Sequence, residues 1–207
     1  MTWRVVNRGG KFRVVVTKEL PGTRWLDQLL AADAEVHISN TTHILTNAEI
    51  IEAIGTKCDG LIGQLTENWG GELFEALKQA GGKVYANYAV GYNNVVVPEA
   101  TKRGIAVGNT PGVLTETTAE MACTLMFGAA RRLSESEVFT KAGKYEGWLP
   151  DLFLGKRLWG GTLGIIGAGR IGAMFAKMVA PGHSMNVLYY DLYTNQALED
   201  FFDDFSA

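Results

Sequence analysis

Residues 162–172 read Thr-Leu-Gly-Ile-Ile-Gly-Ala-Gly-Arg-Ile-Gly, an apolar run followed at once by a glycine-rich turn. Gly167 permits a tight turn from strand to helix, Gly169 lets the backbone approach a pyrophosphate, and Gly172 allows close packing of helix on strand. Asp191 ends a second apolar run and is placed to accept hydrogen bonds from ribose hydroxyls. Glycines that only pack a helix on a strand would explain the turn but not this acid. The order of strand, turn, helix, strand and acid therefore predicts a dinucleotide-binding unit for NAD.

The bulk composition is that of an ordinary globular protein. The chain has 207 residues, 47% of them hydrophobic and 20% charged, with a net charge of −3. No basic face is evident, so a nucleic-acid partner is not expected. Cys58 and Cys123 are too few for a disulfide framework, which favours a reducing compartment. No apolar run approaches the ~18 residues of a membrane span, so we expect a soluble intracellular protein.

The N-terminal segment is rich in basic residues before the first acid, Glu19, as in some organelle transit peptides. Gly9-Gly10 would break the amphipathic helix that a transit peptide needs, and residues 12–17 have a β-branched strand pattern. We therefore interpret this segment as part of the folded domain.

Residues 12–110 alternate short apolar runs with helical stretches, a pattern typical of βαβ units and a parallel sheet. The predicted strands are 13–17, 35–39, 60–64, 84–88 and 105–109. The predicted helices run from Pro21 through Leu30, from a capping box of Thr46 and Glu49 to about Gly55, through Leu73 to Gly81-Gly82, and from Pro98 to Gly104. This half is predicted to be a doubly wound, flavodoxin-like domain.

A longer helix is predicted to follow, from a capping box of Thr117 and Glu120 to about Ala142. Its apolar face would consist of Ala122, Leu125, Met126, Ala129 and Leu133. The aromatic-rich segment 145–159 would connect it to the dinucleotide half, and the acidic segment after Asp191 would be a poorly anchored helix. The predicted fold class is α/β, with two doubly wound Rossmann-like domains. We assign 1–115 to a substrate domain, 116–160 to a linking helix and connection, and 161–207 to an incomplete NAD-binding domain.

Several motifs occur in the order found in the D-isomer-specific 2-hydroxyacid dehydrogenases, which this chain resembles from Lys11 to about Tyr193. The motifs are residues 89–94 (Ala-Val-Gly-Tyr-Asn-Asn), 104–112, 116–120 and the glycine fingerprint. Segments 58–67, 145–150 and 190–193 look like those of the NADH-dependent hydroxypyruvate reductases within this family. The resemblance implies reduction of hydroxypyruvate or glyoxylate, small 2-oxo acids, to glycerate or glycolate.

The resemblance also implies roles for particular residues. Val90 and Gly91 would present backbone N–H groups to the substrate carboxylate, although a glycine at a strand-end turn has a purely structural explanation too. Thr117 would lie near the nicotinamide, unless it only caps a helix. Arg170 would contact the pyrophosphate, although without the resemblance a solvated Arg is the default explanation, and Ile171 would belong to the cofactor-binding residues. The helix region 117–142 would form a homodimer interface.

The family's catalytic Arg, Glu and His have no counterpart among these residues, and we expect them in sequence after Ala207. His37, His43 and His183 are expected to be structural or solvated, and no metal site is predicted. We therefore predict no catalytic residue and no activity for these 207 residues alone. Two alternatives stay open: a non-catalytic, NAD-responsive interaction module and an inactive truncated product. Full-length relatives often end in a peroxisomal tripeptide, which residues 205–207 are not.

Overall fold

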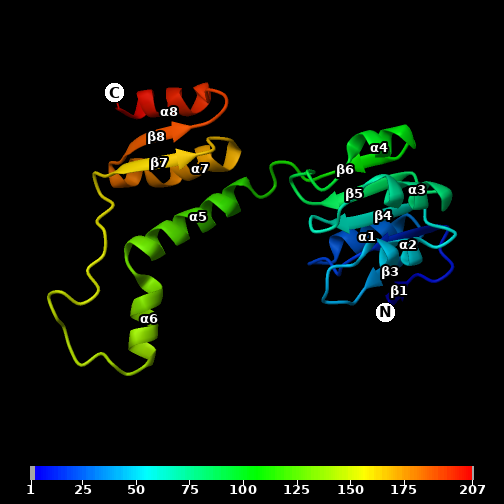
Figure 1. Cartoon of the computed structure of the whole chain (residues 1–207), viewed down its shortest axis with the longest axis horizontal. Coiled ribbons are helices and arrows are strands. Elements are labelled where there is room, and N and C mark those ends of the chain that lie inside the picture. The colour runs from blue at the N-terminus through cyan, green and yellow to red at the C-terminus, as the bar shows by residue number, and fades with distance from the viewer. Residues whose placement is uncertain (1–2, 207) are drawn as a thin grey trace. The chain divides into compact units, whose positions relative to one another are not determined.

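The computed structural model describes residues 3–206. The chain divides into two compact units, Met1–Pro111 and Gly112–Ala207, which are labelled by element in Figure 1. Among the described residues, no helix is both long and apolar enough to cross a membrane.

The first unit is built on a six-stranded sheet with the strand order β1-β3-β2-β4-β5-β6. The strands are β1 (Trp3–Val6), β2 (Phe12–Val16), β3 (Ala34–Ser39), β4 (Gly60–Gln64), β5 (Val84–Tyr88) and β6 (Ala106–Gly108). Strands β2 to β6 pair in parallel, which confirms the five predicted strands to within one or two residues at each end. Strand β1 was not predicted. It pairs antiparallel with β3 at the edge of the sheet, so the basic N-terminal segment is part of the fold.

Helices cover both faces of this sheet. Helix α1 (Arg24–Ala31) packs on one face, over a core that includes Val14, Val36 and Ile38. The other face carries α2 (Asn47–Ile54), α3 (Gly71–Gln79) and α4 (Val97–Lys102). These three helices enclose a larger core around Trp69 and Tyr85. Because the crossovers place helices on both faces, the central strands are apolar on both sides.

The helix ends of this unit mostly follow the sequence signals. The capping box of α2 is confirmed: the Thr46 side chain accepts from Glu49 N, and the Glu49 side chain accepts from Thr46 N. Helix α1 begins at Arg24 rather than at Pro21. Gly104 has a φ of +65° just after α4, a left-handed conformation that suits glycine and ends the helix.

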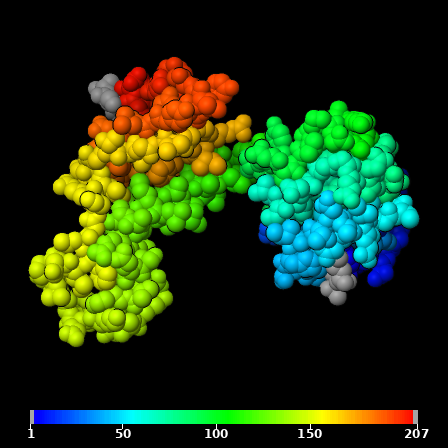
Figure 2. Space-filling view, in the orientation of Figure 1, coloured from blue at the N-terminus to red at the C-terminus, as the bar shows by residue number. Residues whose placement is uncertain are grey.

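The predicted long helix of the second unit is interrupted. It is two helices, α5 (Thr115–Ala130) and α6 (Leu133–Lys141), separated at Arg132, which has a φ of +54°. Lys156 N donates to the Ala130 carbonyl at 2.8 Å, which takes the acceptor that a continuing helix would use. Sequence periodicity could not reveal this contact from a distant segment. The chain from 144 to 156 folds beside α6, as the yellow atoms in Figure 2 show.

The start of α5 also differs from the prediction. The helix begins after Leu114, with no side-chain cap, so Thr117 and Glu120 form no capping box. The predicted apolar face is confirmed only at Met126, which packs against the core of the small sheet; Leu125 is 64% exposed, and the buried residue Ala119 lies outside the predicted set.

The rest of the second unit consists of a two-stranded parallel sheet and its helices. Strands β7 (Thr162–Ile166) and β8 (Asn186–Tyr190) coincide with the apolar run before the glycine turn and with the one that Asp191 ends. Helix α7 (Arg170–Val179), a short 3-10 helix (Pro181–His183) and α8 (Gln196–Ser206) complete it. Leu198 of α8 is 1% exposed and lies in the core with Leu163 and Ile165, so this helix is anchored rather than frayed.

The described residues of this unit cover one face of the small sheet. Leu163 and Ile165 point into the core under α7 and α8. On the other face Ile166, Leu188 and Tyr190 are 93%, 66% and 68% exposed. We refer to these three side chains as the open face.

Candidate functional site

The glycine fingerprint forms the turn between β7 and α7. Gly167 has a φ of +93°, a left-handed conformation that a side chain rarely adopts. No atom lies within 4 Å of the position that a Cβ would take on Gly169, so the approach to this residue is open. At Gly172 a Cβ would lie 2.1 Å from the Gly167 carbonyl oxygen, so only glycine fits there. Gly167 and Gly172 thus have conformational and steric reasons within the chain, whereas Gly169 leaves space for a ligand.

The start of α7 follows directly from this turn. Gly169 is the N-cap residue, and Arg170 and Ile171 are the first two residues of the helix. Arg170 is exposed and Ile171 is half-buried. The N–H groups of a first helical turn have no partner inside the helix and carry partial positive charge. The arrangement is suited to an anion such as a pyrophosphate.

The structure brings Asp191 to the same end of the sheet as the fingerprint. Gly167 N donates to the carbonyl of Tyr190 at 2.8 Å, and Asp191 is the next residue. One Asp191 carboxylate oxygen accepts from Leu192 N at 2.7 Å, which fixes the orientation of the side chain at the end of β8.

Asn195 fastens the loop after β8 to the fingerprint. Its Nδ2 donates to the Ala168 carbonyl at 2.6 Å, and its Oδ1 accepts from Leu198 N in the first turn of α8. This residue was not predicted from the sequence. An Asn before a predicted helix is a common N-cap, and only the tertiary structure shows its second contact.

Thr117 lies in the same unit, in the first turn of α5, and its side chain is exposed. Helix α5 packs along α7, and Met126 of α5 contributes to the core of the small sheet. Among residues 3–206 the Thr117 side chain makes no hydrogen bond to the fingerprint. A role near the nicotinamide therefore stays a prediction.

Val90 and Gly91 lie in the first unit, in the loop that follows β5. Three consecutive carbonyls of this loop are held by hydrogen bonds. The Ala89 carbonyl accepts from Thr110 N at 2.9 Å, the Val90 carbonyl from Asn109 Nδ2 at 2.8 Å, and the Gly91 carbonyl from Asn87 Nδ2 at 3.0 Å.

Because these three carbonyls are held in place, the geometry of the peptide bond also determines where the N–H groups that follow them point. In a trans peptide the N–H points opposite to the preceding carbonyl, and residues 3–206 contain no cis peptide. The N–H groups of Val90, Gly91 and Tyr92 therefore point away from the three anchoring groups. Within the described part of the chain they have no hydrogen-bond acceptor, and no atom lies within 4 Å of a Cβ position on Gly91. Such a set of free N–H groups suits a carboxylate.

A buried polar network contacts this loop through the hydrogen bond from Asn87 to the Gly91 carbonyl. Asn87 is 2% exposed and Glu67 3% exposed. Tyr85 Oη donates to Asn87 Oδ1 at 3.0 Å, and Asn94 Nδ2 donates to the Glu67 carbonyl at 2.9 Å. Burial raises the pKa of the Glu67 carboxyl, with hydrogen bonds from Thr17 and Trp69 acting in the opposite direction. Asn87, Asn94 and Asn109 were not predicted from the sequence, although their positions at or near strand ends were a usable signal.

The histidines have local partners. His37 Nε2 lies 2.5 Å from Glu35 Oε1, and His43 Nε2 lies 2.9 Å from Glu49 Oε1. His183 Nδ1 lies 3.0 Å from the Val179 carbonyl. In the described residues no group of three or more His, Cys, Asp or Glu side chains is placed to hold a metal ion.

The free cysteines differ in burial. Cys58 is fully buried, and burial raises the pKa of its thiol to about 11. Cys123 is only partly buried.

Comparison with known proteins places these features in a family. The model of the D-isomer specific 2-hydroxyacid dehydrogenase catalytic domain matches residues 14–206. The chain is 56% identical over 198 residues to glycerate dehydrogenase of Cucumis sativus, covering 95% of this chain and 52% of that one. It is 57% identical over 198 residues to the peroxisomal glycerate dehydrogenase HPR of Arabidopsis thaliana, covering 95% and 51%.

A solved structure agrees with this similarity. The crystal structure of the TT0316 protein from Thermus thermophilus matches with a TM-score of 0.83 at 37% identity, covering 89% of this chain and 57% of that one. This chain thus spans about half the length of the relatives that it matches. The fingerprint, the parallel sheets and the family match lead to one conclusion: the chain belongs to the family of D-isomer specific 2-hydroxyacid dehydrogenases.

Proposed function

We propose that this chain functions in an NAD(H)-dependent reductase that converts hydroxypyruvate or glyoxylate to glycerate or glycolate. The observation that carries the proposal is the turn from Gly167 to Gly172, which combines an open approach at Gly169 with the free N–H groups of α7. The similarity to plant glycerate dehydrogenases supports the choice of substrate.

The fingerprint residues fit a dinucleotide. The open space at Gly169 would admit a pyrophosphate, with Arg170 and the N–H of Ile171 beside it. Asp191 would accept from the ribose hydroxyls, and its charge would oppose a 2′-phosphate, which favours NAD over NADP. When bound, the cofactor supplies the hydride, while the protein supplies position, orientation and charge.

The loop after β5 would hold the substrate carboxylate. The N–H groups of Val90 and Gly91 would donate to its oxygens, and the anchored carbonyls keep these donors in place before the substrate arrives. Preorganised donors of this kind need no reorientation during the reaction. The substrate carbonyl would then be held in a fixed orientation.

Reduction of a ketone also needs a proton donor and positive charge near the developing alkoxide. His37 and His43 already pair with Glu35 and Glu49, and His183 lies against the end of α7. We therefore propose that none of the described histidines donates this proton, and that the 207 residues alone do not turn over substrate.

We further propose that two copies associate through the 117–142 helix region. Met121 and Leu125 of α5 are 58% and 64% exposed, and Val138 of α6 is 69% exposed, so an apolar surface is available there. Met126 and Phe127 of α5 are half-buried and contribute less to this surface. Met126 packs into the core under β7, and the Phe127 ring lies 5.0 Å from that of His183. A peroxisomal location of the native polypeptide is proposed only from the Arabidopsis relative.

The test has two arms. In the first, NADH is titrated into the purified 207-residue chain and its fluorescence followed, and we expect saturable binding. In the second, NADH oxidation is followed with hydroxypyruvate and with glyoxylate, and we expect none above background. Turnover close to that of a plant glycerate dehydrogenase would contradict the second expectation. Binding of NADH without turnover by the native polypeptide from its source would favour a non-catalytic interaction module instead.

A further inference from the structure

Asn195 connects three parts of the second unit. Its side-chain amide donates to the Ala168 carbonyl at 2.6 Å, inside the glycine fingerprint. Its side-chain oxygen accepts from Leu198 N at 3.1 Å, at the start of α8. Its backbone N–H donates to Tyr189 Oη at 3.1 Å, on β8. The partners settle which way the amide points, since a carbonyl can only accept and an N–H can only donate.

The contact with Ala168 determines the direction of a neighbouring donor. The Ala168 carbonyl and the Gly169 N–H belong to one trans peptide and point in opposite directions. With the carbonyl held by Asn195, the Gly169 N–H is turned to the other side of the turn. The Gly169 N–H has no acceptor among residues 3–206.

The same contact closes the loop that carries Asp191. This loop leaves β8 after Tyr190 and reaches α8 at Gln196. The Gly167–Tyr190 hydrogen bond holds its beginning against the fingerprint, and the Asn195–Ala168 hydrogen bond holds its end. Asp191 lies between these two attachment points.

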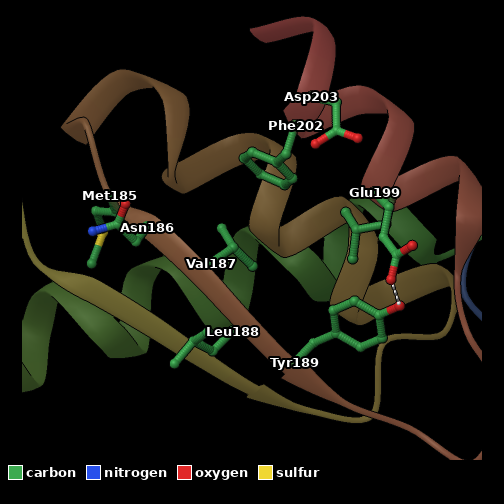
Figure 3. A pocket seen from close by; sticks show the side chains of 9 residues that line it. Met185, Asn186, Val187, Leu188, Tyr189, Glu199, Phe202 and Asp203 are labelled. Atoms are coloured by element: carbon green, nitrogen blue, oxygen red, sulfur yellow. Dashed lines mark hydrogen bonds between the residues drawn. The ribbon is translucent and has the colours of Figure 1, made fainter. Parts of the chain in front are cut away.

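Tyr189 of β8 and Glu199 of α8 hold Asn195 through two linked hydrogen bonds. Tyr189 Oη donates to Glu199 Oε1 at 2.6 Å, the contact drawn as a dashed line in Figure 3. Tyr189 Oη can therefore accept from Asn195 N while it donates to the carboxylate. Helix α8 is thus attached to β8 next to the residue that holds the fingerprint.

We propose that Asn195 is a positioning residue for the dinucleotide: through the Ala168 peptide it orients the Gly169 N–H toward the pyrophosphate and keeps the Asp191 loop beside the fingerprint. The inference rests on the proposed NAD function. It adds a residue outside the Gly-x-Gly-x-x-Gly pattern and makes α8 part of the cofactor site's support.

Two substitutions separate this role from simple helix capping. Asn195→Ser keeps a neutral N-cap for α8, but its short side chain cannot also reach the Ala168 carbonyl. Asn195→Ala removes both contacts. Gln196→Ala is the matched control, because the Gln196 side chain donates to Asp200 on the exposed side of α8, away from the fingerprint.

Three quantities are measured on the 207-residue chain: the NADH dissociation constant, the thermal unfolding midpoint, and the exchange rates of the Gly167 and Ala173 amides without cofactor. These amides donate to Tyr190 and Gly169 and report on the turn itself. We expect both Asn195 variants to bind NADH about tenfold more weakly and to exchange these amides about tenfold faster. Only Asn195→Ala should lower the unfolding midpoint clearly, and Gln196→Ala should resemble the wild type.

Wild-type affinity and exchange in Asn195→Ser would overturn the inference and reduce Asn195 to a helix cap. Failure of the wild-type chain to bind NADH would instead overturn the proposed function, and with it the cofactor role of Asn195. Faster exchange in Asn195→Ser without a change in NADH affinity would also overturn the cofactor role, since the turn would then loosen without consequence for binding.

Discussion

A Cβ on Gly172 would lie 2.1 Å from the carbonyl oxygen of Gly167, so the first turn of α7 contacts the backbone of the fingerprint directly. Gly172→Ala must move the helix away from the turn. We expect a loss of about 1–3 kcal/mol in the free energy of unfolding, typical of overpacking, and weaker NADH binding. Chemical denaturation and NADH titration measure the two effects.

Gly164→Ala is the control for this substitution. Gly164 lies on β7, and no atom lies within 4 Å of its Cβ position. We expect near wild-type stability and NADH affinity. Equal effects of the two substitutions would contradict the steric role of Gly172.

Asp191→Ala should weaken NADH binding about tenfold or more, because hydrogen bonds to a charged group contribute ~1.5–3 kcal/mol each. It should also reduce the preference for NADH over NADPH, since the repulsion of a 2′-phosphate is lost. Parallel fluorescence titrations with both cofactors test this, with Asp200→Ala on the exposed side of α8 as control. Unchanged NADH affinity in Asp191→Ala would mean that this acid does not face the ribose.

Asn109→Ala frees the Val90 carbonyl and should disorder the donor formed by the Gly91 N–H. Asn109 is exposed, so we expect little change in stability. Oxalate, a dicarboxylate that cannot be reduced, serves as probe. In the wild type its titration should shift the NMR signals of the Gly91 and Tyr92 amides, and in Asn109→Ala it should do so at severalfold higher concentration. Identical oxalate shifts in the two proteins would show that the anchored carbonyls do not prepare a carboxylate site.

Asn87→Ala serves as a comparison for Asn109→Ala, because Asn87 is buried whereas Asn109 is exposed. Asn87 is 2% exposed and bonds to Tyr85, Gly91 and Asn94. Its loss leaves buried polar groups unpaired, at about 1–3 kcal/mol for each group. We therefore expect chemical denaturation to show a clear loss of stability in Asn87→Ala that Asn109→Ala lacks.

The capping box of α2 should respond to acid. Hydrogen bonds from the Thr46 backbone and from His43 and Thr46 side chains lower the pKa of Glu49 from 4.5 to about 2. A lowered carboxyl pKa stabilises the folded state above the unfolded pKa, and this stabilisation is lost as the pH falls toward the folded pKa. The relevant window therefore runs from pH 4.5 down to about pH 2.

Glu49→Gln keeps the size of the side chain and removes its charge. We expect a lower unfolding midpoint than wild type at about pH 6, and a difference that shrinks steadily between pH 4.5 and about 2. Thermal unfolding followed by circular dichroism measures it. A difference that stays the same across this window would contradict the charge-assisted cap.

The open face of the small sheet should drive self-association. Ile166, Leu188 and Tyr190 are exposed together, and a two-stranded sheet has unpaired strand edges. We expect light scattering of the 207-residue chain at micromolar concentration to report species larger than a monomer. The double substitution Leu188→Thr and Tyr190→Thr should reduce the apparent mass. Met121→Gln with Leu125→Gln tests the α5 surface separately, and a strictly monomeric wild-type chain would contradict association through either surface.

The groove beside β8 is a second exposed feature of this sheet. Val187, Tyr189, Phe202 and Asp203 line a cavity of about 670 Å³ between β8 and α8, seen from close by in Figure 3. Backbone groups of β8 border it, so an added strand could pair there. A chain extended beyond Ala207 with the sequence of the Cucumis sativus relative should protect the β8 amides from exchange. Unchanged exchange would show that the extension folds elsewhere.

Local sequence determined much of this protein. Strand bounds such as 60–64 and 84–88 follow from short apolar runs bounded by turn residues, because strands at the centre of a covered parallel sheet require such runs. The α2 cap follows from Thr46 and Glu49, since its contacts span three residues. The glycine fingerprint is equally local, because turn conformation and helix approach depend on adjacent residues.

Tertiary structure alone decided the rest. The break between α5 and α6 depends on Lys156 reaching the Ala130 carbonyl, and the edge strand β1 depends on its pairing with β3. Asn109 and Asn195 position the candidate sites through carbonyls at Val90 and Ala168. Periodicity and capping rules describe neighbours along the chain, whereas each of these contacts joins residues that only the folded backbone brings within hydrogen-bond distance.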